Sequence, residues 1–269
     1  LVAVIGAGPA GMEAAVTLKQ RGFDVVVFDK RDEIGGNLHV AKKPPFKGKF
    51  EWAIDYYKSM AKKLNITMKL GKEVTAQEVL ALKPYSILVA TGSNVISIPL
   101  EGLDQVQTVQ AHDVLANDMQ FANKKVVVIG GGITGLETAL YINRQGTNQV
   151  SVVDMLPEWP VDMLDMRYQN EALLEVRHCN DQGVALFYNN KVVKFADGKL
   201  FIESTKDGEV KELPADVIVL SVGVKPNDAL WQELLASGHP SVWKAGDAIA
   251  TGKINKAVLH GSKFGYSLN

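Results

Sequence analysis

A glycine pattern of the form GxGxxG occurs twice in this chain, each time directly after a short apolar run. The first copy is Gly6–Gly11 and the second is Gly130–Gly135. In a strand–turn–helix unit, the first glycine makes the tight turn, the second lets the backbone approach a pyrophosphate, and the third lets the helix pack closely on the strand. Two such units predict the α/β fold class, with parallel sheets that helices cover and two sites suited to a dinucleotide.

The first copy carries every part of this fingerprint. Leu1–Ile5 predicts a buried strand, a helix follows the glycines and ends before Gly22, and Asp24–Phe28 predicts the second strand. Asp29 follows that strand, 23 positions after the first glycine, where an acid accepts hydrogen bonds from the ribose hydroxyls of an adenosine. The free N–H groups and the positive dipole end of the helix favour the phosphates.

The second copy repeats the same order of elements. Lys125–Ile129 predicts a strand, a helix runs to Arg144, and a further strand over Val150–Val153 ends at Asp154. A carboxylate at this position pairs with a free ribose 2′-hydroxyl and repels a 2′-phosphate, whereas NADP sites place an arginine nearby. The following residues, Met155-Leu-Pro-Glu158, bring no cation, so the second site is predicted to prefer NADH.

The remaining segments complete the fold without adding chemistry. An apolar face over Lys49–Leu64, made by Phe50, Ile54, Tyr57, Ala61 and Leu64, predicts a helix packed on the core. Further strands are predicted at Ser86–Ala90, Val217–Val224 and Val242–Lys244, and a last helix from about Asn255, with Ala257, Phe264 and Leu268 packing inward. The basic stretch Lys42–Lys49 predicts a solvated loop, with contact to phosphates or to a partner domain as the alternative.

Composition limits the classes of partner. The 269 residues suit two domains, and a formal net charge of −1 gives no basic field for nucleic acid or an anionic membrane. We find no signal peptide and no apolar run of the roughly 18–20 residues that span a bilayer. The single cysteine, Cys179, excludes a disulfide framework, and no metal site is predicted. These features favour a cytoplasmic protein, and a chain that begins inside its first strand suggests a piece of a longer polypeptide.

The sequence resembles the flavoproteins with two dinucleotide-binding domains, the group that includes glutathione and thioredoxin reductases. The resemblance rests on Gly6–Gly11 with Asp29, on Ala90-Thr-Gly92, on Ala245-Gly-Asp247, and on Gly130–Glu137. It implies two Rossmann-like domains, with an NAD domain over 104–227 inserted in an FAD domain over 1–103 and 228–269. By the same resemblance Asp247 would bind the ribityl chain of FAD, and Glu137 would lie near the nicotinamide.

A narrower resemblance covers Glu33–Leu38, Ala41–Lys47 and Tyr56–Lys58. These segments are similar to the C-terminal half of Old Yellow Enzyme-like NADH:flavin oxidoreductases, the group of 2,4-dienoyl-CoA reductase, enoate reductases and trimethylamine dehydrogenase. That group implies a partner domain on the same parent chain, an N-terminal barrel that carries FMN and an iron–sulfur cluster. A homo-oligomer is left open.

The resemblance implies hydride transfer from NADH to FAD, and from there electron transfer to the FMN and iron–sulfur centres of the missing barrel. We assign no catalytic residue, because the cofactors carry the chemistry. A non-redox module that binds ADP in place of FAD, as in trimethylamine dehydrogenase-like relatives, is the alternative, and a free-standing reductase of a small electron carrier is a third. Cys179 is expected in the core, and His260 is a candidate neighbour of the flavin.

The residues predicted to bind a nucleotide fall into two sets. For FAD or ADP they are Gly6, Gly8, Pro9, Ala10, Gly11, Asp29, Lys30, Gly36, Asn37, Ala90, Thr91, Gly92, Gly246 and Asp247. For NAD they are Gly130, Gly132, Ile133, Thr134, Gly135, Glu137, Asp154 and Gly223.

Overall fold

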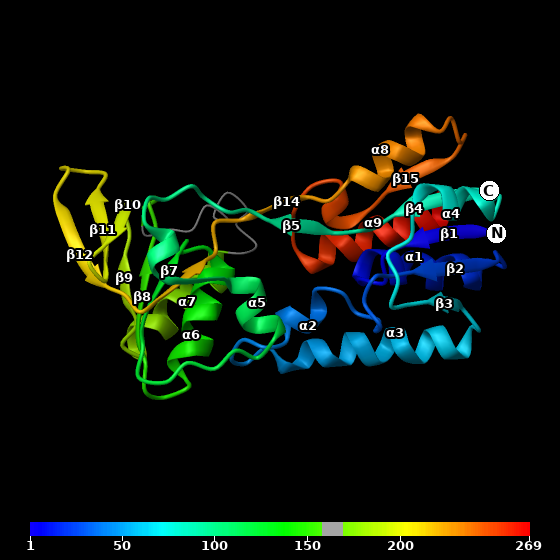
Figure 1. The fold of residues 1–269 in the computed structure, drawn as a ribbon. Coiled ribbons are helices and arrows are strands. Elements are labelled where there is room, and N and C mark those ends of the chain that lie inside the picture. Colours follow the sequence, from blue (N-terminus) through cyan, green and yellow to red (C-terminus); the bar gives the residue numbers. More distant parts are fainter. Residues whose placement is uncertain (158–168) are drawn as a thin grey trace. The chain divides into compact units, whose positions relative to one another are not determined.

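A computed structural model describes residues 1–157 and 169–269 (Figure 1). Glu158, which the sequence places just after Asp154, lies outside the described residues. The chain forms two compact units. Unit 1 consists of Leu1–Lys42, Lys49–Asn94 and Val224–Asn269, and unit 2 of Lys43–Gly48 and Val95–Gly223.

Unit 1 is built on a five-stranded parallel sheet with the strand order β15-β4-β1-β2-β3. Every residue of the three central strands is buried, and all of them except Ser86 are apolar, as expected for a sheet covered on both faces. The strands are β1 (Val2–Ile5), β2 (Val25–Phe28), β3 (Thr67–Lys69), β4 (Ser86–Val89) and β15 (Val242–Lys244).

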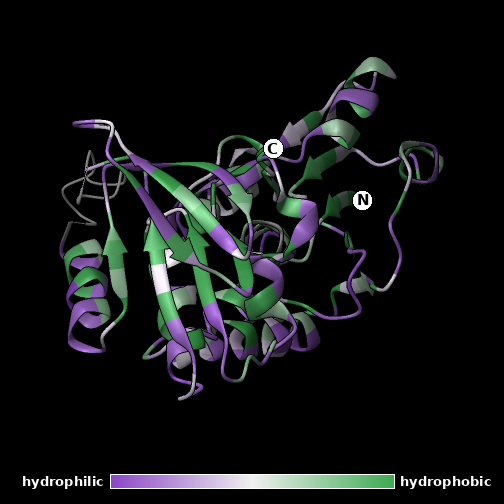
Figure 2. Cartoon of the chain, turned by 60° about the vertical axis from the view of Figure 1, so that its left-hand side comes forward, coloured by the Kyte–Doolittle hydropathy of each residue, from purple (hydrophilic) through white to green (hydrophobic). Residues whose placement is uncertain are grey.

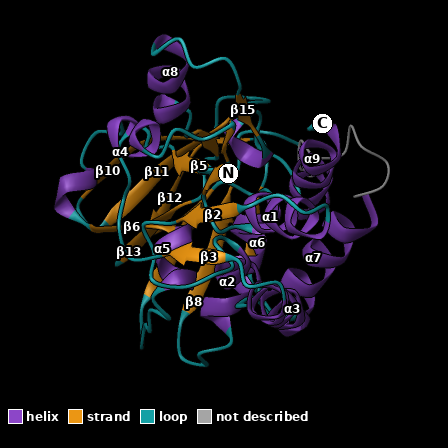
Figure 3. Ribbon diagram, turned by 90° about the vertical axis from the view of Figure 1, so that its right-hand side faces the viewer, coloured by secondary structure: helices purple, strands orange, loops and turns teal. Residues whose placement is uncertain are grey.

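Helices cover both faces of this sheet. One face packs against α1, α3 and α9, which Figure 3 shows side by side, and the other packs against α4 and α8. The predicted face of α3 is confirmed, since Ile54, Tyr57 and Ala61 are buried. The helices are α1 (Pro9–Gln20), α2 (Leu38–Ala41), α3 (Glu51–Lys63), α4 (Ala76–Ala81), α8 (Ala229–Ala236) and α9 (Ile254–Ser267).

The contact between α1 and α9 is a close backbone contact. A Cβ at Gly261 would lie 2.1 Å from the carbonyl oxygen of Ala10, and a Cβ at Gly265 would lie 2.6 Å from the side chain of Thr17. Ala257, Phe264 and Leu268 are buried in the same core, as predicted. α9 therefore packs directly along α1, from Ala10 in its first turn to Thr17 in its third.

Unit 2 repeats this plan. Its parallel sheet has the order β6-β13-β7-β8-β9, and a three-stranded antiparallel sheet, β10-β11-β12, adds to it. In Figure 2 both the strands and the helices carry hydrophobic residues with hydrophilic residues among them. The parallel strands are β6 (Gln107–Gln110), β7 (Lys125–Ile129), β8 (Gln149–Val153), β9 (Ala185–Phe187) and β13 (Val217–Leu220). The other elements are β10 (Asn190–Ala196), β11 (Lys199–Ser204), β12 (Val210–Pro214), α5 (Ala111–Ala116), α6 (Ile133–Asn143) and α7 (Gln169–Asp181).

The prediction of one strand over Val217–Val224 is wrong. β13 ends at Leu220, and a separate strand, β14 (Val224–Pro226), pairs with β5 (Ser93–Val95). The break covers residues 221–223, and Gly223 has a φ of 103°, in the region that favours glycine and does not occur within a regular strand. Within the described residues, no helix combines the length and the apolar character that a bilayer span requires.

Candidate functional site

The first glycine turn in unit 1 has no room for side chains at two of its glycines. A Cβ at Gly6 would lie 2.2 Å from the carbonyl oxygen of Ala90, and a Cβ at Gly11 would lie 1.9 Å from that of Gly6. Gly6 also has a φ of 114°. The fingerprint and the Ala90-Thr-Gly92 motif therefore meet where β1 and β4 end, at the sheet edge where ligands bind in open α/β folds.

Gly8 differs from these two glycines. It caps α1, and a Cβ placed on it would meet only Gly36 Cα, at 3.9 Å. Gly36 itself must stay small, because its own Cβ would lie 2.8 Å from Gly8 Cα. The Gly35 amide donates to the carbonyl of Ala7 at 2.9 Å, which fixes this second loop over the first. Space next to the start of α1 is thus left open for a phosphate.

The predicted ribose acid of unit 1 is held against the glycine turn. Asp29 Oδ2 accepts a hydrogen bond from the Ala7 amide at 2.6 Å, and Oδ1 accepts one from the Arg31 amide at 2.8 Å. Each carboxylate oxygen keeps a further lone pair for a hydroxyl donor. Lys30 is exposed beside it.

The other predicted residues of unit 1 are joined by polar contacts that the sequence did not reveal. Asn227 donates its amide to the Gly92 carbonyl at 3.0 Å and accepts from the Thr91 hydroxyl at 2.5 Å. Ser93 Oγ donates to Asp247 Oδ2, and the Gly252 amide donates to Oδ1, both at 3.1 Å. Ser93 directly follows the Ala90-Thr-Gly92 motif, and this position in the sequence was the one feature that could have pointed to its contact with Asp247.

Asp247 lies in a 3₁₀ turn over Gly246–Ala248, close to the start of α1. A Cβ at Gly246 would lie 3.0 Å from Ala10 Cβ. Burial raises the pKa of Asp247, against the opposing effects of the Ser93 and Gly252 hydrogen bonds and of His260. His260 Nδ1 is buried and has no hydrogen-bond partner among the described residues. This part of unit 1 therefore contains polar groups with unused hydrogen-bonding capacity.

Unit 2 reproduces the geometry of the first glycine turn. Gly130 has a φ of 108°, and its Cβ would lie 2.2 Å from the carbonyl oxygen of Ser221. A Cβ at Gly135 would lie 1.9 Å from the Gly130 carbonyl, while one at Gly132 would meet nothing within 4 Å. Asp154 Oδ2 accepts from the Gly131 amide at 2.6 Å. The two turns are thus structural duplicates.

Glu137, which the sequence associates with the nicotinamide, lies on α6 and pairs with Lys47. Lys47 also contacts Glu171 Oε1 at 2.6 Å, and its side chain is only 18% exposed. The prediction of a solvated loop is therefore wrong at Lys47, because two carboxylates stabilise its ammonium inside unit 2. Burial raises the pKa of Glu137, against the opposing effect of Lys47.

Cys179 is fully buried in the core of unit 2, as predicted for a small apolar residue. Burial raises the pKa of its thiol to about 12, so the thiolate is not populated at neutral pH. No cluster of His, Cys, Asp and Glu suited to a metal ion occurs among the residues that the structure describes.

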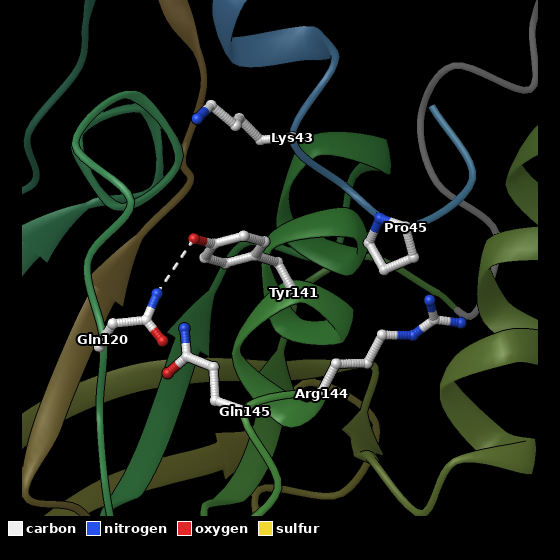
Figure 4. Close-up of a pocket in the computed structure, with 6 residues that line it drawn as sticks. All are labelled: Lys43, Pro45, Gln120, Tyr141, Arg144 and Gln145. Atoms are coloured by element: carbon white, nitrogen blue, oxygen red, sulfur yellow. Dashed lines mark hydrogen bonds between the residues drawn. The ribbon is translucent and has the colours of Figure 1, made fainter. Parts of the chain in front are cut away.

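A hollow of about 350 Å³ lies at the C-terminal end of α6 (Figure 4). Gln120 Nε2 and the Tyr141 hydroxyl approach to 3.4 Å within it. Its lining residues are Lys43, Pro45, Gln120, Tyr141, Arg144 and Gln145. The second glycine turn lies at the opposite, N-terminal end of the same helix, so this hollow contains none of the predicted nucleotide-binding residues.

Comparisons with known proteins point to one family. The family model described as pyridine nucleotide-disulphide oxidoreductase matches residues 1–260. An NADH oxidase of Thermoanaerobacter brockii is 32% identical over 99% of this chain and 41% of its own length. A bilirubin reductase of Mediterraneibacter gnavus is 35% identical over 84% of this chain and 34% of its own length.

Solved structures agree with these relatives. A complex of 2-naphthoyl-CoA reductase superimposes with a TM-score of 0.90 at 29% identity, covering 99% of this chain and 39% of that one. The chain thus spans about two fifths or less of each of these three proteins.

Proposed function

Because the chain belongs to the pyridine nucleotide-disulphide oxidoreductase family, we propose that it is a redox module that takes a hydride from NADH into a bound FAD. Unit 1 would hold the FAD and unit 2 the NADH. The observation that carries this assignment is the duplicated glycine turn, in which Asp29 and Asp154 accept the same backbone hydrogen bond at the same length, 2.6 Å.

The residues of both units fit a dinucleotide. The second glycine of each turn caps a helix and has open space beside it. Apart from its neighbours in the chain, nothing lies nearer than 3.9 Å to a Cβ at Gly8 or within 4 Å of one at Gly132. A pyrophosphate needs this close approach to backbone N–H groups and to the positive end of the helix dipole. The acid at the end of the next strand would then accept hydrogen bonds from a ribose.

Each group of this chain has a binding role in the proposed reaction. When bound, FAD supplies the hydride acceptor. The amides at the start of α1 and α6 would bind the phosphates, and Asp29 and Asp154 would orient the adenosine riboses. Asp247, held by Ser93 and Gly252, would bind the ribityl chain. Hydride transfer from NADH requires no general base, so no side chain is assigned that task.

We further propose that electrons pass from FAD to FMN and iron–sulfur centres in an N-terminal barrel of a longer cytoplasmic parent chain. Two observations support this step. The relatives are at least twice as long as the part that this chain matches. One of them is named a bilirubin reductase and another a 2-naphthoyl-CoA reductase, which suggests an unsaturated organic compound as the final acceptor.

A module that binds ADP and does no redox work is the second candidate. It would use the same glycine turn and Asp29, because both recognise only the ADP half of FAD. Asp247 favours the redox module, since a half-buried carboxyl group with two fixed hydrogen bonds has no task toward ADP. The complete second turn, with Gly130 and Asp154 in place, points the same way.

Anaerobic titration of the purified chain with NADH tests the proposal. We expect a yellow protein, or one that becomes yellow on incubation with FAD, whose flavin absorbance bleaches on addition of NADH. A colourless protein that binds ADP at least as tightly as FAD, and that NADH leaves unchanged, would establish the ADP-binding module instead.

A further inference from the structure

The duplication between the units extends beyond the glycine turns to the loop that follows the neighbouring strand. In unit 1 the amide of Asp29 donates to the carbonyl of Lys69 at 3.2 Å, and the amide of Lys72 donates back to the carbonyl of Asp29 at 3.2 Å. In unit 2 the amide of Asp154 donates to Phe187 at 3.0 Å, and the amide of Asn190 donates back at 2.9 Å. The loop after β3 and the loop after β9 are therefore equivalent.

Two further features fix the alignment residue by residue. The Gly71 amide donates to the Arg31 carbonyl at 2.8 Å, as the Asn189 amide does to the Leu156 carbonyl at 2.8 Å. Gly71 and Asn189 both have positive φ values, 77° and 58°. Lys69–Lys72 thus corresponds to Phe187–Asn190, and Asp29–Arg31 corresponds to Asp154–Leu156.

When the two backbones are matched, the side chains around the two acids differ in charge: unit 1 carries cations where unit 2 carries uncharged residues. The matched segments of unit 1 contain four cations, Lys30, Arg31, Lys69 and Lys72, and their counterparts in unit 2 are Met155, Leu156, Phe187 and Asn190. A further difference is aromatic, because Tyr188 occupies the position of Leu70. Every cation around the first acid is therefore replaced by an uncharged residue around the second.

Tyr188 lies directly beside the second acid. A Cβ at Gly131 would lie 3.0 Å from Tyr188 Cε1 and 3.1 Å from Asp154 Cβ, so the ring and the acid flank the same backbone position of the turn. Tyr188 is half-buried and follows β9, at the carboxyl edge of the parallel sheet. A ribose that hydrogen-bonds to the carboxylate of Asp154 must approach this ring.

We propose that Tyr188 is a specificity-determining residue of the second nucleotide site, where its ring forms the wall beside the adenosine ribose and excludes a 2′-phosphate. The proposal rests on the proposed function, since it presupposes that unit 2 binds a nicotinamide nucleotide. A flat ring offers apolar surface to a sugar and no cation to a phosphate, whose charge is costly to desolvate. Selection for NADH is then shared between the Asp154 charge and the Tyr188 ring.

The test uses the whole chain loaded with FAD, so that the first site is filled, and two probes that lack nicotinamide: ADP-ribose and 2′-phospho-ADP-ribose. Tyr188→Leu installs the residue that the first unit carries at this position. We expect it to raise the dissociation constant for ADP-ribose by about 3- to 10-fold, measured by calorimetry. Preference for the unphosphorylated probe should fall at the same time.

Three controls define the role of the ring. Tyr188→Phe keeps the ring and should leave both affinities within about twofold of wild type. Leu70→Ala changes the equivalent residue of unit 1 and should not alter the ratio between the probes. In an Asp154→Ser background, Tyr188→Leu should tighten 2′-phospho-ADP-ribose by a further factor of about three or more.

The outcomes separate the two ideas. If the unmodified protein binds neither probe, the proposed nucleotide function of unit 2 is wrong. If it binds ADP-ribose but Tyr188→Leu changes neither the affinity nor the ratio, in protein whose melting temperature is unchanged, the role of Tyr188 is wrong and the function stands. A loss of affinity in Tyr188→Phe as large as in Tyr188→Leu would also overturn it, because the ring would then not be the active element.

Discussion

Ser93 Oγ and Asp247 Oδ2 are joined by a hydrogen bond of 3.1 Å, although 154 positions separate the two residues in the chain. The bond links the segment that follows β4 to the turn that follows β15, the two neighbouring strands at one side of the unit 1 sheet. Asp247 is thus held in place by groups of the protein itself, and its proposed role toward the ribityl chain can be tested separately from the ADP half.

We expect Asp247→Ala to weaken FAD binding by roughly 10- to 150-fold while leaving ADP affinity nearly unchanged. One charge-assisted hydrogen bond is worth about 1.5–3 kcal/mol. ADP has no ribityl chain, so the substitution removes no hydrogen bond to ADP. Ser93→Ala should give a smaller loss in the same direction. Calorimetric titration of the flavin-free protein with each ligand measures both effects.

Gly8→Val provides the matched control, because it fills the space that both ligands need at the start of α1. It should block FAD and ADP alike. If FAD binds the unmodified chain no better than ADP, and Asp247→Ala changes neither affinity, the ribityl assignment is wrong.

A second prediction concerns the choice between NADH and NADPH. The flavin of the loaded protein should be reduced faster by NADH, because Asp154 is acidic and the residues of unit 2 that correspond to the cations of unit 1 are all uncharged. They are Met155, Leu156, Phe187 and Asn190. Replacing Asp154 by Ser and Met155 by Arg should shift the preference toward NADPH by about 1.5–3 kcal/mol. Stopped-flow reduction with each nucleotide gives the ratio, and equal rates in the unmodified protein would contradict the assignment.

Cys179→Ser should leave NADH-driven reduction of an artificial dye within about threefold of the original rate. The thiol is buried in the core of unit 2, its pKa is raised to about 12, and no second cysteine exists in the sequence to form a redox pair. A hundredfold loss in protein that remains folded and yellow would reveal a thiolate step.

A fourth prediction follows from the ion pair of Lys47 with Glu137. Lys47→Met removes the ammonium and leaves the buried carboxylate of Glu137 without its counter-charge. This should lower the free energy of unfolding by about 2–4 kcal/mol at pH 7–8. The loss should be smaller than for a fully buried pair, because both side chains keep some exposure. Denaturant unfolding of the purified protein measures the loss.

The stability loss caused by Lys47→Met should depend on pH. Burial already raises the pKa of Glu137, and without Lys47 it should rise further. A carboxyl group whose pKa is raised on folding stabilises the protein fully below its ordinary pKa of about 4.3, and this contribution is lost as the pH climbs through the raised value. The Lys47→Met defect should therefore shrink toward pH 5, and Glu137→Gln should rescue it at pH 7; a pH-independent defect would show that packing, not charge, is responsible.

The sequence was sufficient to predict a residue's place in the fold wherever that place is determined by neighbouring residues in the chain. Gly6, Gly130, Asp29 and Asp154 could be placed because an apolar strand, a glycine turn, a helix and a terminal acid succeed one another within a single βαβ unit. Ser93 and Tyr188 could not, since their importance comes from neighbours that are 154 and 57 positions away, Asp247 and Gly131. Pairing between segments so distant leaves no periodic pattern in the sequence.

The prediction of a solvated loop was wrong at Lys47 for a related reason. Composition alone describes Lys42–Lys49 as a solvated loop, and only tertiary structure brings Glu137 and Glu171 to Lys47. The Val217–Val224 run shows the opposite problem, where β-propensity continues past the point at which Gly223 turns the chain. In both cases a long-range or backbone constraint overrode the local preference.

The close packing of Gly261 against the Ala10 carbonyl means that α1 is covered only after α9 has been synthesised. Unit 1 needs Val224–Asn269 for its edge strand and for the helix that supports α1, yet residues 95–223, all assigned to unit 2, are synthesised in between. At about 5–20 residues per second, that intervening stretch takes roughly 6–26 s to emerge from a ribosome. Throughout this interval β4 has no β15 beside it, and the apolar face of α1 lacks its cover. We therefore expect unit 1 to bind FAD only after Val224–Asn269 has been synthesised, and the edge of β4 to stay uncovered until then.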